Sequence, residues 1–156
     1  METTYNIHPP EPRWTHVALR VKDINATIEW YTENPPLSLV TRREDETGYA
    51  AWLGHTDNPH SPFLLVLTQF FPDKDPFADA PNTVLGPFAH LGIELPDLES
   101  LKKAAEKMQA IGSLVMPVQE MPPPIGWIFM AKDPDGNTLE FSFDQGVYAT
   151  FQELAE

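Results

Sequence analysis

An internal repeat constrains the fold of this chain more than any other feature of its sequence. Residues 14–24 (WTHVALRVKDI) return as residues 88–98 (FAHLGIELPDL), with the same spacing from His16 to His90 as from Asp23 to Asp97. The equal spacing means that neither copy has an insertion relative to the other. A duplicated unit of about half the chain is therefore the simplest interpretation. Each copy places a histidine at the same point of a strand, so His16 and His90 are predicted to face each other across a pseudo-twofold axis.

Both copies predict a βαβββ unit. Alternating apolar and polar residues indicate the strands, and Asp23 and Asp97 are typical helix N-caps. In the first unit the predicted elements are a strand over residues 13–21, the capped helix, and strands over 37–42, 47–53 and 63–68. In the second they are a strand over 88–95, a helix ending at Gly112, and strands over 113–118, 126–132 and 137–143. The predicted fold is therefore α+β, built from two tandem modules.

The modules are predicted to share one core, because a chain of 156 residues with 42% hydrophobic content can bury one of ordinary size. The single domain predicted over residues 1–156 divides into an extended arm (1–12), module 1 (13–69), a linker (70–86), module 2 (87–143) and a tail (144–156). Three prolines indicate the extended arm. The tail is expected to pack as a short helix.

Composition excludes several classes of function. The chain has no cysteine, which rules out thiolate ligands and cysteine nucleophiles. Its net charge of −13 argues against nucleic acid and anionic membrane surfaces as partners. No apolar run approaches the ~18 residues of a membrane span, and the N-terminus lacks a signal pattern, so a cytoplasmic protein is expected. A small molecule is the expected partner.

Glu140 completes a possible metal site. It lies in the segment DPDGNTLEF, after a turn at residues 133–136. Two neutral imidazoles and one carboxylate occupy one face of an octahedron and leave the opposite face open. Alternatively, His16 and His90 are satisfied core histidines and Glu140 is exposed. The duplicated histidine position and the apolar neighbours of Glu140 favour the metal site, because a buried acid needs a charge partner.

These features resemble the vicinal oxygen chelate superfamily, which includes glyoxalase I, extradiol dioxygenases, methylmalonyl-CoA epimerase and the fosfomycin and bleomycin resistance proteins. The resemblance covers residues 14–143 and rests on the strand histidine before each helix and on the DPDGNTLEF hairpin. It implies a cupped eight-stranded mixed sheet around a divalent metal, Fe(II) being favoured and Mn(II), Ni(II) or Zn(II) possible. It also implies a homodimer, in which modules are sometimes exchanged so that His16 of one chain meets His90 and Glu140 of the other.

The resemblance leaves the reaction open among three classes. Glyoxalase I and the epimerase use a fourth ligand, whose equivalent here is Val66; Gln69 lies nearby but at the wrong point of the strand. This slightly favours dioxygenase chemistry over a glyoxalase-like lyase or isomerase. No basic residue follows Glu140, which argues against a phosphonate substrate. A protein like the bleomycin resistance group, which binds a drug without chemistry, is the third alternative.

Other side chains are candidates for the surroundings of the site. Trp127 and Phe129 share one face of their strand and form either an aromatic pocket wall or part of the core. Glu94 occupies the position of the second copy that is equivalent to Arg20. Arg20 is therefore predicted either to form an ion pair with Glu94 or to bind a substrate carboxylate. The remaining candidates for pocket lining, acid, base or lid are Trp52, His55 and Tyr148, and Glu140 is also a possible proton acceptor.

Overall fold

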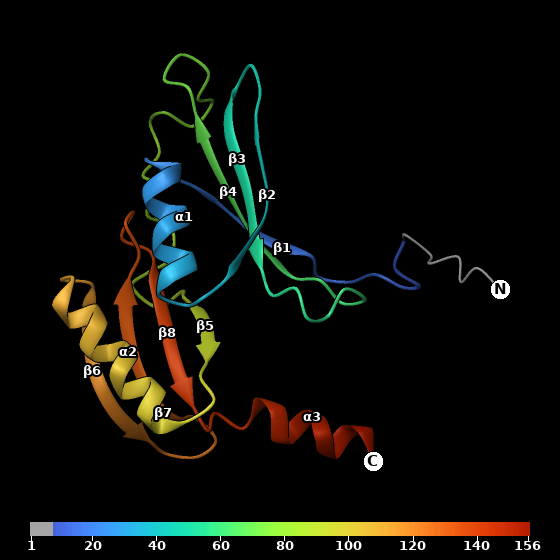
Figure 1. Ribbon diagram of the computed structural model, residues 1–156, viewed down its shortest axis with the longest axis vertical. Coiled ribbons are helices and arrows are strands. Elements are labelled where there is room, and N and C mark those ends of the chain that lie inside the picture. The colour runs from blue at the N-terminus through green and yellow to red at the C-terminus, as the bar shows by residue number, and fades with distance from the viewer. Residues whose placement is uncertain (1–7) are drawn as a thin grey trace.

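The computed structural model describes residues 8–156 and contains two βαβββ modules followed by a third helix (Figure 1). Part of the predicted N-terminal arm, residues 1–7, lies outside the described residues, and residues 8–15 form no helix or strand. Module 1 consists of β1 (His16–Arg20), α1 (Ile24–Glu33), β2 (Ser38–Glu44), β3 (Gly48–Gly54) and β4 (Leu64–Phe70). Module 2 consists of β5 (Leu91–Glu94), α2 (Leu98–Ala110), β6 (Leu114–Met121), β7 (Gly126–Lys132) and β8 (Thr138–Phe143), and α3 (Val147–Ala155) follows it. The predicted order of elements is confirmed.

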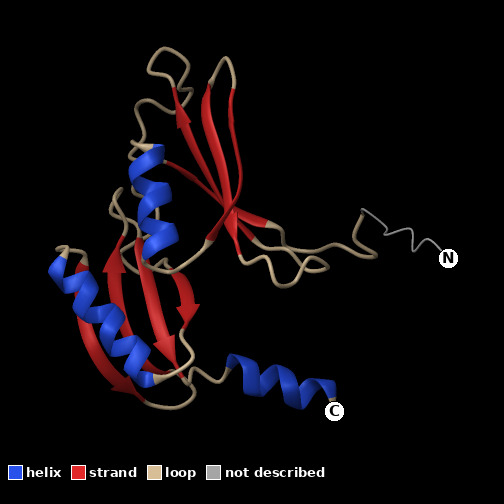
Figure 2. Ribbon diagram, viewed as in Figure 1, coloured by secondary structure: helices blue, strands red, loops and turns tan. Residues whose placement is uncertain are grey.

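Each module forms its own four-stranded sheet (Figure 2). The strand order is β1-β4-β3-β2 in module 1 and β5-β8-β7-β6 in module 2. The first strand of each module pairs in parallel with the last, and the other pairs are antiparallel. The eight strands are thus mixed, as predicted, and divided between two hydrogen-bonded sheets.

The strand register preserves the sequence repeat. In module 1 Ala18 pairs with Val66, and in module 2 the equivalent Gly92 pairs with Glu140. The two modules therefore share their strand pairing as well as their sequence pattern. Val66 occupies the structural equivalent of the Glu140 position, as predicted.

Both predicted helix caps are present. The Asp23 carboxylate accepts hydrogen bonds from the amides of Asn25 and Ala26 at 3.0 and 3.1 Å, and Asp97 accepts one from Ser100 at 2.7 Å. These bonds satisfy amides that have no partner within a helix. They fix where α1 and α2 begin, directly after the strands that carry the histidine positions.

One hydrophobic core extends through both modules. Alternate residues of each sheet face its helix, so Leu19 and Leu67 are buried in module 1 and Phe129 and Phe141 in module 2. The rings of Phe129 and Phe141 stack at a centroid distance of 4.6 Å and an interplanar angle of 5°. The opposite face of each sheet carries the histidine positions.

The C-terminal helix α3 forms, but the prediction that it packs on the domain is wrong. None of its residues is buried, and it projects away from both sheets (Figure 1). Its exposed apolar side chains are Val147, Tyr148, Phe151 and Leu154. Within the described part of the chain, no helix combines the length and apolar character needed to cross a membrane.

Candidate metal centre

His90 and Glu140 lie together on the open face of module 2. His90 comes directly before β5, and because side chains alternate along a strand, it shares a face with Gly92, which pairs with Glu140. His90 Nε2 is 3.5 Å from Glu140 Oε2, and the two side chains are 26% and 9% exposed. No atom lies within 4 Å of the point that a Cβ would occupy at Gly92, so there is open space beside the pair.

The hydrogen bonds around the pair determine which atoms face each other. His90 Nδ1 is 2.6 Å from the carbonyl oxygen of Phe88, and since a carbonyl only accepts, Nδ1 carries the proton. In the neutral imidazole, Nε2 then directs a lone pair toward the Glu140 carboxylate. Two acceptors at this distance repel each other unless a proton or a cation lies between them. The pair can therefore share a proton or hold a cation.

His16 is separate from this pair. It is exposed at the start of β1, with Nδ1 2.8 Å from the hydroxyl oxygen of Thr15. Across residues 8–156, no three His, Asp or Glu side chains come together in a way that could hold a metal. A single chain thus brings together two of the three predicted ligands, and His16 is not one of them.

The strand register also accounts for the predicted absence of a fourth ligand. Val66, the equivalent of Glu140, has no donor atom. Gln69 is already engaged, because its side-chain oxygen accepts a hydrogen bond from the Ile24 amide at 2.8 Å. It therefore supports the start of α1 instead of facing the histidines.

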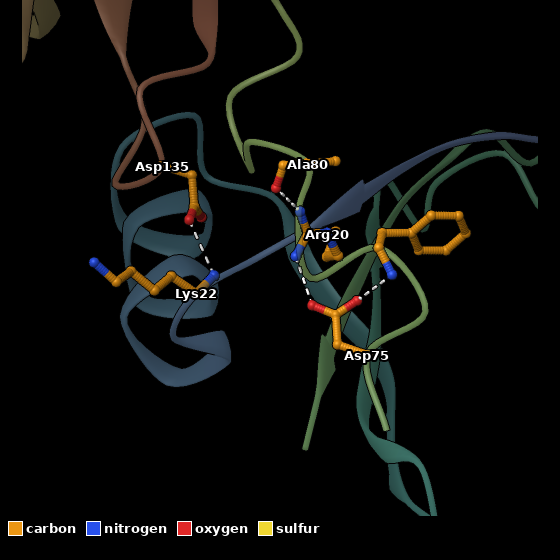
Figure 3. A network of polar contacts seen from close by, with 6 residues as sticks. Arg20, Lys22, Asp75, Ala80 and Asp135 are labelled. Atoms are coloured by element: carbon orange, nitrogen blue, oxygen red, sulfur yellow. Dashed lines mark hydrogen bonds and ion pairs between the residues drawn. The ribbon is translucent and has the colours of Figure 1, made fainter. Parts of the chain in front are cut away.

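The predicted ion pair between Arg20 and Glu94 is wrong. Figure 3 shows Arg20 bound to the linker: Nη1 donates to Asp75 Oδ2 at 2.6 Å, and Nη2 donates to the carbonyl oxygen of Ala80. The Arg20 and Asp75 side chains are only 18% and 15% exposed. The linker folds back over β1 and supplies a partner that has no counterpart at module 2, so the symmetry of the repeat was misleading here.

The predicted aromatic wall requires a correction at Phe129. This side chain is completely buried against Phe141, on the helix face of the sheet, and belongs to the core. Trp127 shares that face and packs against the core as a partly buried residue. Ile128 and Met130 point the other way, and Met130 pairs with Glu140 in the register. The aliphatic pair therefore lies on the ligand face of module 2.

Trp52 lies on the open face of module 1. Its neighbours Ala51 and Leu53 are fully buried toward α1, whereas Trp52 points to the opposite side and is 46% exposed. Val66 pairs with Trp52 in the register, so Trp52 lies beside the strand position equivalent to Glu140. This placement is compatible with the predicted role in a substrate pocket.

His55 and Tyr148 lie at two different hollows. A cavity of about 200 Å³ lies between the modules, with mainly apolar walls that include Tyr31 and Leu139, and His55 lines it. Tyr148, which is 76% exposed, lines a separate hollow with Glu94 and Asp144 beyond the end of β8. The two candidates for proton transfer therefore do not share one site in a single chain.

Gln145 contacts Glu140, although the sequence did not indicate it as a site residue. Its side-chain amide nitrogen donates to Glu140 Oε1 at 2.6 Å, and its backbone amide donates to Glu94 Oε1 at 3.0 Å. The only sequence signal is its position five residues after Glu140. Both contacts depend on how the chain turns after β8, which periodicity does not predict.

The fold and this site define a class of protein. The chain belongs to the Glyoxalase/Bleomycin resistance protein/Dioxygenase superfamily, whose family model matches residues 13–141.

Individual relatives span much of the chain. It is 27% identical over 134 residues to the uncharacterized protein PA2024 of Pseudomonas aeruginosa, covering 86% of this chain and 90% of that protein. The structure of glyoxalase I from Zea mays is 27% identical with a TM-score of 0.63, covering 83% of this chain and 43% of the maize chain. TnmS3, an antibiotic binding protein from Streptomyces sp. CB03234, is 20% identical with a TM-score of 0.57, covering 87% and 98%. The last likeness shows the fold alone.

Proposed function

We propose that this protein is a divalent-metal-dependent enzyme that acts on a small organic molecule which chelates the metal through neighbouring oxygens. His90 and Glu140 would hold the metal together with His16. The observation that carries the proposal is the 3.5 Å approach of His90 Nε2 to Glu140 Oε2, with Nδ1 of the imidazole committed to a carbonyl. Metal-bound histidines commonly have their second ring nitrogen bound in this way.

The separation of His16 supports a dimer with exchanged modules. We propose that His16 of one chain meets His90 and Glu140 of a second chain, because residues 8–156 of one chain bring only two of the predicted ligands together. His16 is suited to this role, since Thr15 engages its Nδ1 at 2.8 Å and Nε2 remains available. A twofold axis would then create two equivalent sites per dimer.

Exposed aromatic residues next to both histidines also support a second chain. Trp14 and Phe88 occupy equivalent positions of the repeat, two residues before each histidine, and are 88% and 87% exposed. The apolar side chains of α3 are exposed as well, and exposed apolar patches commonly mark interaction sites. A partner that covers the surroundings of both histidines would bury these rings.

The residues around the pair assign roles within the reaction. A metal held there would act as a Lewis acid on the substrate oxygens or, as iron(II), would also bind dioxygen. Displaced from the metal, Glu140 would accept a proton through Oε2 while Gln145 holds Oε1. Tyr148 and His55 are the proposed proton-transfer groups, and Arg20 is now assigned to the linker instead of the substrate. Trp52 would contact an apolar or aromatic part of the substrate from module 1.

We favour dioxygenase chemistry because the structural equivalent of Glu140 in module 1 is Val66. A glyoxalase-like lyase or isomerase, working with Mn(II), Ni(II) or Zn(II), is the second candidate, and the 27% identity to maize glyoxalase I favours it. The lyase reaction needs a group that moves a substrate carbon-bound proton. Module 1 offers no carboxylate at the repeated position, so Glu140 would be the only carboxylate of the predicted ligand set for this step.

Metal analysis and activity assays test the proposal together. The protein would be purified without added metal or chelator, beside Glu140→Ala and the exposed-surface control Glu106→Ala. Each variant would be assayed with catechols and with 2-oxoaldehyde adducts after anaerobic loading with iron(II) or manganese(II). We expect the unaltered protein and Glu106→Ala to contain iron in stoichiometric amount per chain and to cleave catechols. Glu140→Ala is expected to lose the iron.

The other outcomes identify the alternatives. Stoichiometric manganese, nickel or zinc with turnover of the adducts would indicate the lyase or isomerase. No metal under any loading condition would contradict both enzymes and leave a protein that binds a drug without chemistry.

A further inference from the structure

We propose that Gln145 is the positioning residue of the metal centre, which holds Glu140 so that a single oxygen, Oε2, is presented to the metal. This inference rests on the proposed metal site. It concerns a residue that no repeat position predicts, since position 71 in module 1 is Phe71.

The backbone after β8 turns in a way that returns Gln145 to the sheet. Asp144 has a φ of 59° and Gly146 a φ of 77°, so both residues flanking Gln145 lie in the left-handed region. A non-glycine residue in that region is uncommon and persists where the surroundings hold it. The backbone amide of Gln145 donates to Glu94 Oε1 at 3.0 Å, which is one such restraint. The turn therefore places the Gln145 side chain beside Glu140.

The side-chain amide of Gln145 can take only one orientation. A carboxylate only accepts, so the amide nitrogen must be the group that faces Glu140 Oε1, at 2.6 Å. The amide oxygen then accepts from the hydroxyl of Ser142 at 3.3 Å, and Ser142 is only 1% exposed. Ser142 and Glu140 are two residues apart on β8 and share a face. The amide is thus held at both ends.

This bond divides the two oxygens of Glu140 between two tasks. Oε1 is committed to Gln145, and Oε2 faces His90 Nε2. A carboxylate restrained in this way binds a metal through one oxygen and leaves a further coordination position for substrate or solvent. Without the amide, Glu140 could rotate or offer both oxygens. Outer partners of this kind typically contribute about 10- to 100-fold to metal affinity.

Manganese(II) binding to the whole chain tests the role of Gln145. We expect Gln145→Leu to weaken Mn(II) affinity by about 10- to 100-fold. Ser142→Ala removes only the support of the amide, and a smaller loss is expected. Gln152→Leu makes the same chemical change at an exposed position of α3 and is expected to bind Mn(II) as the unaltered protein does. Urea unfolding of the metal-free variants shows whether each one folds.

A spectroscopic readout separates positioning from general stability. The visible spectrum of the cobalt(II)-loaded protein reports the number and arrangement of ligands, and Gln145→Leu is expected to change it whereas Gln152→Leu leaves it unchanged. Unaltered Mn(II) affinity and an unaltered cobalt spectrum in a folded Gln145→Leu variant would overturn the inference while the metal site stands. If neither the unaltered protein nor His90→Ala binds Mn(II) or cobalt(II), the proposed metal site is wrong. The proposed role of Gln145 is then wrong as well.

Discussion

The Tyr31 hydroxyl donates to Asp133 Oδ2 at 2.8 Å and so joins helix α1 of module 1 to the turn between β7 and β8 of module 2. Both groups are buried, and burial, together with the nearby Asp133 charge, raises the pKa of Tyr31 far above its usual range. The Tyr31 hydroxyl therefore stays protonated and continues to donate its hydrogen bond to Asp133. The same turn leads into β8 and Glu140, so the contact connects the packing of the modules to the strand that carries the candidate ligand.

Replacing Tyr31 by Phe is expected to lower the free energy of unfolding by about 1–3 kcal/mol, because Asp133 loses a buried donor. Urea unfolding measures the change. Tyr148→Phe is the matched control, since that ring is 76% exposed, and it should leave the unfolding midpoint unaltered. Equal stability of Tyr31→Phe and the unaltered protein would show that the bond contributes nothing net.

Arg20 provides a test between a structural and a substrate-binding role. Because its guanidinium bonds both Asp75 and the Ala80 carbonyl, Arg20→Lys is expected to loosen the linker, lysine being unable to reproduce the planar two-pronged contact. Limited proteolysis should cut residues 70–86 faster in this variant. Metal binding and the Michaelis constant for any substrate should stay unaltered. A large rise in the Michaelis constant without faster cleavage would instead assign Arg20 to the substrate.

The N-cap of α2 is predicted to depend on an acceptor oxygen and on pH. Hydrogen bonds from Ser100 lower the pKa of the exposed Asp97 carboxyl. A lowered folded-state pKa means that the stabilisation is present above the ordinary Asp pKa and is lost as pH falls through the folded value. Asp97→Ala should therefore destabilise the protein most at neutral pH and progressively less in acid. Asp97→Asn keeps an acceptor oxygen and should therefore lose less stability than Asp97→Ala at neutral pH. Thermal unfolding at several pH values measures both variants, and a less stable Asp97→Asn would contradict this prediction.

Asp135 is expected to show the opposite pH dependence. Burial raises its pKa, and the neighbouring Asp133 charge adds to this, although its carboxylate accepts from the Lys22 amide at 2.9 Å (Figure 3). A raised folded-state pKa favours the protonated form, so its contribution is present below the ordinary Asp pKa and is lost as pH rises through the folded value.

Asp135→Asn keeps an acceptor oxygen for Lys22 and removes the ionisation. Its stability relative to the unaltered protein should therefore increase between acid and neutral pH, as measured by urea unfolding at several pH values. Asp57→Asn, in the exposed loop after β3, should show no such trend. A relative stability of Asp135→Asn that decreases toward neutral pH would contradict this assignment.

Features encoded locally could be predicted from the sequence. The two modules, their caps at Asp23 and Asp97 and the equivalence of Val66 and Glu140 all follow from a repeat with constant spacing, since equal spacing imposes equal strand register. The proximity of His90 and Glu140 follows as well, because His90 lies two residues before Gly92 on the same face, and Gly92 pairs with Glu140 on the adjacent strand.

Features that depend on chain path could not be predicted in this way. Arg20 meets Asp75 only because the linker folds back over β1, and Gln145 reaches Glu140 through two left-handed residues. Repeat symmetry suggested Glu94 as the partner of Arg20, although Glu94 is used to hold the Gln145 amide. For α3, a short helix is predicted and forms, but the sequence does not say which surface its apolar side chains cover.

Mixed dimers of His16→Ala and His90→Ala chains test whether two chains share each metal site. The two chains would be co-expressed with different tags, purified through both tags, and measured for metal binding. If the metal lies between His16 of one chain and His90 and Glu140 of the other, each mixed dimer contains one intact site and one site that lacks both histidines. We therefore expect the mixed dimer to recover one metal ion of unaltered affinity, whereas each variant alone binds weakly. A mixed dimer that binds no better than either variant alone would contradict this expectation.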